Sequence, residues 1–372
     1  MSLRVRVRGA GAYRLIVHTR LTGRRPKGWP GRAVRRTRKG RQNRPVIIRA
    51  DAAGLVAGYA LDLVLGDPRR WHPVAGFGRA AGVLERKLYA PRRRNGVVFA
   101  GVAVGVPVAV GLGLAAVSRR SPIARAALVA GATWTVLGGR TLRKEATTMA
   151  RHLRDEDLDA ARGRLGHLCG RNPERLDERE LARATVESVA ENTSDAVVAP
   201  LFWGAVAGLP GLLGYRAVNT LDAMVGHRSE RYARFGTAAA RLDDLLNLVP
   251  SRVTGLLTIA VAGRNRKEAW RVWRRDRNDH PSPNAGQCEA AMAGALGVRL
   301  GGRNVYFGRS EVRPFLGDGP QPAATDVRKA ARISRAVGAG ALLMAVGMRL
   351  AFRGAWGEKR GTAGRGDDVG RR

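Results

Sequence analysis

Apolar residues in this chain gather into segments long enough to cross a lipid bilayer. The clearest segment runs from residue 96 to residue 117 without a single charge, and a helix needs about 20 apolar residues to cross the hydrocarbon core. Weaker candidates, short or interrupted by an ionisable residue, are 52–65, 126–139, 245–263 and 333–352. Each weaker segment has the alternative of a buried helix in a soluble domain. Gly, Ala and Val dominate these segments, as is typical where helices pack closely in lipid.

Polar blocks separate the apolar segments. Residues 140–168 mix leucine and alanine with charged residues, and a Gly-Arg-Asn-Pro break precedes a second helical pattern at 176–192. The longest polar block, 264–332, contains a turn-rich stretch at 280–286 and a glycine-rich stretch at 297–308. The pattern therefore predicts an all-α, polytopic integral membrane protein with polar helical loops.

The charge of the chain is concentrated at its N-terminus. Residues 1–50 hold sixteen of the net 36 positive charges and no acid, so nucleic-acid binding is not expected of the remaining chain. We expect these residues to be a basic, disordered extension or the product of an upstream start codon, with binding to anionic lipid as the alternative. The membrane-embedded domain would span 51–352, followed by a disordered tail at 353–372. Two cysteines, Cys169 and Cys288, are too few for a disulfide framework.

Acidic residues recur at helical spacing near the middle of the chain. Glu187, Glu191 and Asp195 stand at i, i+4 and i+8, where like charges share one helix face and cost about 0.2–0.5 kcal/mol per pair. We expect a cation to offset them, either a magnesium ion that bridges carboxylates and nucleotide phosphates or arginines from a neighbouring block. The alternative is a solvated acidic face.

One short motif occurs twice. The pattern Asn-Thr-x-Asp-Ala stands at 192–196 and again at 219–223. A straight helix of about twenty residues would hold the two copies about 30 Å apart, yet Pro200, Pro210 and several glycines interrupt the segment between them. We hypothesise a broken or re-entrant hairpin that returns both motifs to one membrane face. Chance similarity is the alternative.

Cations and acids alternate after the second motif. The arginines are Arg216, Arg228, Arg231, Arg241 and Arg252, and the acids among them are Asp222, Glu230, Asp243 and Asp244. One segment thus offers cations for an anionic substrate and ligands for a metal. The chain has no Walker loop, no dinucleotide-binding glycine motif, no HExxH and no GxSxG, so ATP, if used, is not held by a Walker-type cradle.

Five blocks in order make the chain resemble the CobD/CbiB family of adenosylcobinamide-phosphate synthases, integral membrane proteins of cobalamin biosynthesis. The blocks are LDLVLGDPRRWHPV (61–74), ESVAENTSDAVVAPLF (187–202), YRAVNTLDAMVGHRSERY (215–232), ARLDDLLNLVPSR (240–252) and SPNAGQCEAAMAGALGVRLGG (282–302). The last block departs from the family pattern, which often has an aromatic residue and a proline where Gln287 and Cys288 stand here.

The resemblance implies ATP-dependent amide formation between adenosylcobyric acid and (R)-1-aminopropan-2-ol or its O-phosphate. Such a reaction needs metal ligands, cations for the transferring phosphoryl group and a base for the incoming amine. The acids expected to supply metal ligands and the base are Glu187, Glu191, Asp195, Asp222, Asp243 and Asp244, with Glu191, Asp195, Asp222 and Asp243 as the metal ligands. The residues expected to bind substrate are Asn192, Arg216, Asn219, Arg231, Arg241, Arg252 and Asn284.

The expected partners are ATP, Mg²⁺, the corrinoid, aminopropanol phosphate and the lipid bilayer, with a homo-oligomer left open. ATP chemistry requires the motif loops of this multi-pass cell-membrane protein to face the cytoplasm. The alternative function is a polytopic transporter, because broken helices and acids near the membrane are also typical of secondary carriers.

Overall fold

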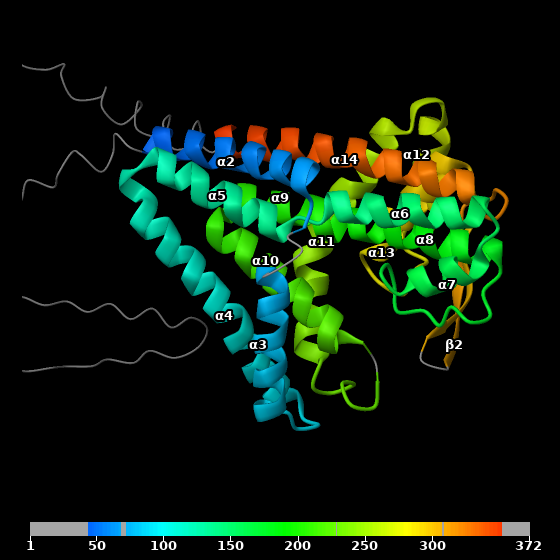
Figure 1. Ribbon diagram of the computed structural model, residues 1–372, viewed down its shortest axis with the longest axis horizontal. Helices are drawn as coiled ribbons and strands as arrows, with labels where there is room; N and C mark the ends of the chain where they lie inside the picture. Colours follow the sequence, from blue (N-terminus) through cyan, green and yellow to red (C-terminus); the bar gives the residue numbers. More distant parts are fainter. Residues whose placement is uncertain (1–43, 68–71, 228, 307–308, 352–372) are drawn as a thin grey trace, which may run out of the picture. The chain divides into compact units, whose positions relative to one another are not determined.

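The computed structural model describes residues 44–67, 72–227, 229–306 and 309–351 of the chain, and these form α-helices joined by short turns (Figure 1). The helices of the first half are α2 (Arg44–Leu65), α3 (Pro73–Leu88), α4 (Arg93–Val117), α5 (Pro122–Val136), α6 (Gly139–Arg154), α7 (Leu158–Leu165) and α8 (Glu178–Thr193). Those of the second half are α9 (Ala199–Ala207), α10 (Leu209–Leu221), α11 (Thr237–Val261), α12 (Arg266–Asp276), α13 (Ala285–Leu296) and α14 (Ala324–Ala351). Short 3₁₀ turns, η1 (Ser118–Arg120) and η4 (Gly263–Asn265), follow α4 and α11.

Within the described part of the chain, three helices are long and apolar enough to cross a membrane: the continuous segment Arg93–Arg120 that contains α4, then α11 and α14. They correspond to the predicted segments at 96–117, 245–263 and 333–352. Outward-facing valines on α4, including Val97, Val106 and Val110, give this helix the apolar surface that lipid requires. An all-α membrane fold is therefore confirmed.

The other two predicted segments form α2 and α5, which pack tightly against each other. Gly54 and Gly58 lie one turn apart on α2, and a Cβ added at either would fall within 2.6 Å of Val129 or 2.5 Å of Thr133 on α5. Small residues at this spacing let two helix backbones approach closely. The pair lies beside the C-terminal half of α14 (Figure 1).

The long helix α14 connects two hydrophobic cores. Its N-terminal half, including Val327, packs with α6, α8 and α13, whereas its C-terminal half, including Val337 and Ala341, packs with α2 and α9 and shares a core with residues of α5 and α10. A third core joins α3, α4 and the start of α11 around Phe99 and Phe235. The described fold thus places polar helices at one end of α14 and apolar helices at the other.

The segment between the repeated motifs is a broken hairpin. A π-helical turn, η2 (Ser194–Val198), follows α8; α9 and α10 then meet at Gly208, and a second π-helical turn, η3 (Asp222–Gly226), ends the hairpin. Pro200 and Pro210 stand in the first turns of α9 and α10, where proline costs no backbone hydrogen bond. Both motifs therefore coincide with π-helical turns, a feature frequent at functional sites.

One region departs from the all-α prediction. The glycine-rich stretch expected to be a loop forms an antiparallel hairpin of β1 (Leu300–Tyr306) and β2 (Arg309–Leu316). Gly301 and Gly302 have φ values of +85° and +91°, and the strand register shifts between Leu300 and Gly302. Two glycines in this conformation permit a bulge that a helix-based interpretation does not anticipate.

The predicted boundaries at the chain ends lie mostly outside the described residues. The extension predicted over 1–50 overlaps α2, which begins at Arg44, and residues 1–43 are not described. The predicted tail at 353–372 also lies outside the described residues.

Replacement of Gly208 tests the hairpin. Its φ of +65° and ψ of −140° fall where residues with a Cβ are strained, and an added Cβ would lie 3.2 Å from the Arg125 guanidinium. We expect Gly208→Ala to lower the free energy of unfolding by about 1–3 kcal/mol. The measurement is thermal and denaturant unfolding in detergent. Gly105→Ala is the control, because a Cβ at Gly105 meets nothing within 4 Å; equal effects of both changes would contradict the strained break.

Candidate functional site: a half-buried carboxylate cluster beside an arginine-lined groove

The hairpin brings the two repeated motifs together. The Asn219 side-chain amide, on α10, donates to Asp195 Oδ2 on η2 at 3.5 Å. Asp222 begins η3 one turn after Asn219, and the Asp222 and Asp243 carboxylates interact electrostatically with Asp195. The hypothesis that the two motifs meet is confirmed. Carboxylates from η2, η3 and α11 therefore form one cluster, which we call the carboxylate cluster: Asp195, Asp222, Asp243 and Asp244.

Hydrogen bonds orient part of this cluster and leave part of it open. Tyr215 donates its hydroxyl proton to Asn247 Oδ1 at 2.9 Å, and the Asn247 amide donates to Asp243 Oδ2, also at 2.9 Å. The other oxygen, Asp243 Oδ1, is buried and accepts no hydrogen bond within the described protein. A buried carboxylate oxygen without a partner is costly, so Asp243 is poised to accept a proton donor or a cation.

Burial and mutual repulsion destabilise the charged forms of these acids. Burial raises the pKa of Asp222 to about 6, and the nearby Asp244 carboxylate adds to the rise. Burial also raises the pKa of Asp195 well above its usual value, with further contributions from Asp243 and Glu191. Each shift indicates that a cation placed among these oxygens would be strongly stabilised.

Arg216 links the carboxylate cluster to an open groove. Its Nη1 donates to Asn219 Oδ1 at 3.3 Å, while its Nε is buried and has no acceptor among the described residues. Burial lowers the pKa of the Arg216 guanidinium, and Asp67 and Asp195 partly counter this effect. Arg216 also lines a groove of about 890 Å³ between α3, α10 and η3.

Asp67 was not anticipated as a site residue, although it lies in the 61–74 block. Its Oδ1 is buried and has no hydrogen-bond partner among the described residues, and its charge acts on both Arg216 and His72. Asp67 directly follows a predicted helix and is not part of any repeated or helically spaced motif. Its closeness to Arg216 is therefore visible only in the folded structure.

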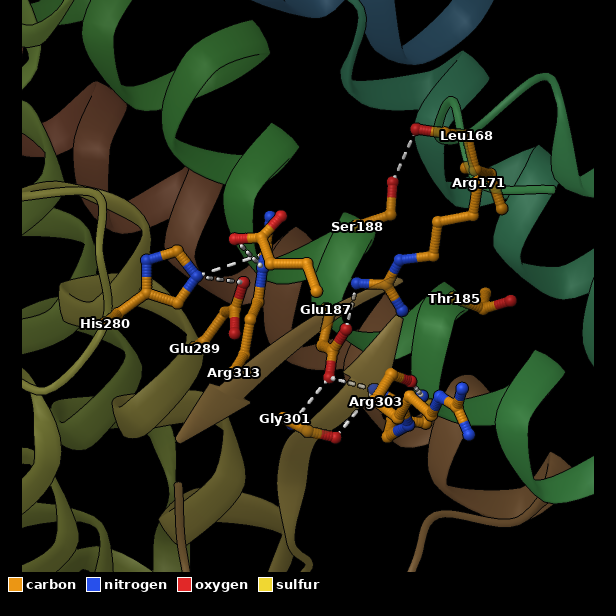
Figure 2. Close-up of polar contacts among 12 residues, drawn as sticks. Leu168, Arg171, Thr185, Glu187, Ser188, His280, Glu289, Gly301, Arg303 and Arg313 are labelled. Atoms are coloured by element: carbon orange, nitrogen blue, oxygen red, sulfur yellow. Dashed lines mark hydrogen bonds and ion pairs between the residues drawn. The ribbon is translucent and has the colours of Figure 1, made fainter. Parts of the chain in front are cut away.

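Glu187 belongs to a separate structural network (Figure 2). One carboxylate oxygen pairs with Arg171, and the other accepts from Arg183 at 3.4 Å and from the Gly301 backbone N–H at 2.7 Å. Arg183 also donates to the Gly301 carbonyl at 2.6 Å. Arginines are therefore the cations that offset Glu187, and these contacts anchor the β-hairpin to α8. We assign Glu187 to this support rather than to the carboxylate cluster.

Glu191 lies next to a second group that sequence reasoning missed. Ligand atoms of Glu191, His280 and Glu289 all lie within 4.8 Å of one another, and Figure 2 shows the His280 ring facing Glu289 and Arg313. Burial raises the pKa of Glu289 well above its usual value. The turn-rich stretch at 280–286 indicated a loop here, but nothing in its pattern pointed to an acid partner on α13.

The hydrogen bonds of His280 disfavour a metal at this second group. Its Nδ1 accepts the Ser282 backbone N–H at 3.0 Å, so the lone pair of that nitrogen is occupied. The Arg313 guanidinium lies 3.1 Å from Nε2 and already supplies positive charge beside the ring. We interpret this group as a hydrogen-bonded network, distinct from the carboxylate cluster.

Several predicted substrate-binding residues instead make local contacts. Arg231 pairs with Glu85 at 2.9 Å and lies 4.3 Å from the centroid of the Tyr89 ring. Arg252 donates to the Leu248 carbonyl at 2.7 Å. These contacts hold the Arg231 guanidinium against the end of α3 and the Arg252 guanidinium against its own helix, α11. Arg241 is exposed, and Arg228 lies outside the described residues.

The two remaining amides have positional roles. Asn284, at the start of α13, donates to the Asp244 carbonyl at 2.8 Å and accepts from the Ser251 hydroxyl at 3.1 Å. It thereby ties α13 to the part of α11 that carries Asp243 and Asp244. Asn192 donates to the Ser188 carbonyl at 2.9 Å within α8.

This helical membrane fold, with carboxylates converging from three segments, defines a membrane protein with a polar site built on a broken hairpin. A family model described as CobD/Cbib protein matches residues 55–334. The chain therefore belongs to the CobD/CbiB family. Relatives of this chain are named cobalamin biosynthesis proteins.

The chain is similar to several proteins named cobalamin biosynthesis protein CobD. That of Mycobacterium tuberculosis H37Rv is 50% identical over 299 residues, covering 79% of this chain and 95% of the relative. That of Geobacter metallireducens is 46% identical, covering 73% and 87%, and that of Rhodobacter capsulatus is 42% identical, covering 79% and 96%. No solved structure matches this chain.

The different environments of Glu187 and Glu289 predict different effects of the same substitution. Glu187→Gln removes the charge that compensates two buried arginines, so we expect a loss of about 3 kcal/mol in the free energy of unfolding. Glu289→Gln should change the free energy of unfolding much less. Burial already favours the protonated, neutral form of Glu289, and glutamine is a neutral side chain of the same shape. The measurement is thermal and denaturant unfolding of both variants in one detergent. Equal destabilisation would contradict the distinction between the two networks.

Proposed function

We propose that this protein joins adenosylcobyric acid to (R)-1-aminopropan-2-ol or its O-phosphate through an amide bond, at the expense of ATP. The observation that carries the proposal is the convergence of Asp195, Asp222 and Asp243 beside Arg216, with Asn219 contacting both Arg216 and Asp195. Membership in a family of cobalamin biosynthesis proteins supports a corrinoid substrate.

The donor chemistry of the carboxylate cluster suits magnesium, although its oxygens do not all lie within 4.8 Å of one another as the ligand atoms of Glu191, His280 and Glu289 do. The donors are oxygens only, which Mg²⁺ prefers, and the buried, unpartnered Asp243 Oδ1 is a vacant acceptor. The raised pKa values of Asp195 and Asp222 reflect uncompensated negative charge. Asp195, Asp222 and Asp243 would hold the ion, and when bound it would neutralise developing charge on the phosphates of ATP.

The proposed amide formation has two steps. The propionate carboxylate attacks the γ-phosphorus of ATP, so a carboxyl C–O–P bond forms and the β–γ bridge breaks to release ADP. The amine then attacks the acyl carbon, a C–N bond forms, and inorganic phosphate leaves. Activation is needed because a free carboxylate is a poor acyl donor.

The chain's own groups have separate tasks in these steps. Arg216 would stabilise charge on the transferring phosphoryl group, since its Nε is buried and awaits an acceptor. Asp244, half-buried at the edge of the cluster, would take the proton that the incoming ammonium must lose. Asn219 would orient Arg216 against Asp195.

We place the carboxylate cluster at the cytoplasmic side of the cell membrane because ATP is available there. Asp243 lies near the N-terminal end of α11, one of the three candidate spans among the described residues. The apolar faces of α4 and α11 would contact lipid.

The proposal is tested with purified protein in detergent, adenosylcobyric acid, aminopropanol phosphate, ATP and magnesium, with the amide product detected by mass. We expect Asp222→Asn and Asp243→Asn to lower the rate by about 10²–10³-fold, the range found when one electrostatic group of an active site is removed. Glu230→Gln is the control, because Glu230 is exposed in the same region and should leave the rate unchanged.

Two results would contradict the proposal. Unimpaired amide formation by Asp243→Asn would remove the carboxylate cluster from the reaction. Absence of product from the wild-type protein, together with ion-coupled flux in proteoliposomes without ATP consumption, would favour a transporter instead.

A further inference from the structure

The groove beside Arg216 has a positively charged lining. Its volume is about 890 Å³, within the range of pockets that take drug-sized ligands. Three arginines, Arg79, Arg86 and Arg216, line it together with His72, Thr220 and apolar residues such as Val74, Val83 and Met224. None of the described residues that line it is acidic, so its arginines suit an anion.

The cations of the groove are available for a ligand. Arg79 and Arg86 are exposed, and neither has an ion-pair partner among the described residues. Arg216 contributes a buried Nε with no acceptor in the described protein. A buried guanidinium N–H that remains unsatisfied indicates a missing acceptor, and this atom stands where the groove meets the carboxylate cluster.

The shape of the groove favours an extended ligand. Arg79 and Arg86 lie seven residues apart on α3, which corresponds to about 10 Å along the helix axis. A single phosphate group is too small to contact cations spread over this length. Between them Gly82 leaves the helix surface flat: a Cβ there, or at Gly78, would only just reach Met224, at 3.9 Å and 4.0 Å.

We propose that the groove between α3 and α10 binds the polyphosphate of a nucleoside triphosphate, with its terminal phosphate directed toward Arg216 and the carboxylate cluster. This inference rests on the proposed ATP-dependent reaction and names the place where the nucleotide binds. The corrinoid substrate is a poorer match, because its one reactive carboxylate carries less charge than three arginines. A divalent cation bound by the carboxylate cluster would then neutralise part of the charge on these phosphates.

The test compares ligand binding by the double variant Arg79→Gln/Arg86→Gln with wild type, in detergent and with Mg²⁺ present. Binding of a fluorescent ATP analogue is measured directly, and ATP, tripolyphosphate and aminopropanol phosphate are used as competitors. We expect the double variant to bind ATP and tripolyphosphate at least about tenfold more weakly, a change of about 1.4 kcal/mol. Lys87→Gln, which removes an exposed charge from the same helix outside the groove, should bind as wild type does.

Three results would overturn the inference. ATP affinity of the double variant within about twofold of wild type, less than about 0.4 kcal/mol, would exclude the groove. Weakened binding of aminopropanol phosphate alone would assign the groove to the smaller substrate. Displacement of the ATP analogue by nanodiscs containing phosphatidylglycerol, but not by tripolyphosphate, would assign it to lipid headgroups. The melting temperatures of the variants must match wild type, as expected for exposed arginines.

The inference and the proposed reaction fail in different ways. If wild type forms the amide while the double variant retains its ATP affinity, the reaction stands and the groove does not bind nucleotide. If the double variant loses ATP affinity but no amide forms under any condition, the groove binds nucleotide and the reaction is different.

Discussion

The repulsion among half-buried carboxylates is the constraint on which this structure depends. Asp195, Asp222 and Asp243 are brought into one region by a hairpin that breaks at Gly208, and partial burial disfavours their negative charge. Arg216 contacts the cluster through Asn219. Repulsion of this kind opposes folding unless a cation offsets it.

Glu187 is a buried acid whose charge is fully compensated by the protein itself. There, two arginines and a backbone N–H occupy both carboxylate oxygens, and the network fixes the β-hairpin to α8. The carboxylate cluster instead retains an unpartnered oxygen on Asp243 and an unpartnered N–H on Arg216. An unsatisfied acceptor in the cluster and an unsatisfied donor on the arginine that contacts it through Asn219 are the features expected of a site for a cation and an anion together.

The rest of the fold holds the hairpin in place. Arg349, near the end of α14, pairs with Asp51 on α2 and donates to the Ala205 carbonyl on α9 at 3.3 Å. Arg125 on α5 pairs with the same aspartate. These contacts join four helices close to Gly208, so the break is fixed at its tip while Asn247 and Asn284 fix the α11 side of the cluster.

The sequence predicted the apolar spans, the broken hairpin and the meeting of its two motifs, because length, hydropathy, proline and glycine act locally. The choice of Asp195, Asp222 and Asp243 as site residues came instead from the resemblance to the CobD/CbiB family. The sequence grouped Glu187 with them because helical spacing shows which residues share a face, but not that Arg171 and Arg183 occupy that face. The sequence did not predict the roles of Asp67, His280 and Glu289, because the residues near them come from distant segments. It did not predict the β-hairpin at 300–316 because that hairpin depends on tertiary contacts with α8.

The central claim is that the carboxylate cluster is a divalent-cation site, and the most direct measurement is the melting temperature of the purified protein as Mg²⁺ is titrated, without nucleotide or corrinoid. A ligand that binds only the folded state stabilises it by about 2.7 kcal/mol at 100 times its Kd. The account predicts a saturable rise for wild type and none for Asp243→Asn. An identical response of both proteins to Mg²⁺, or no response of wild type, would contradict it.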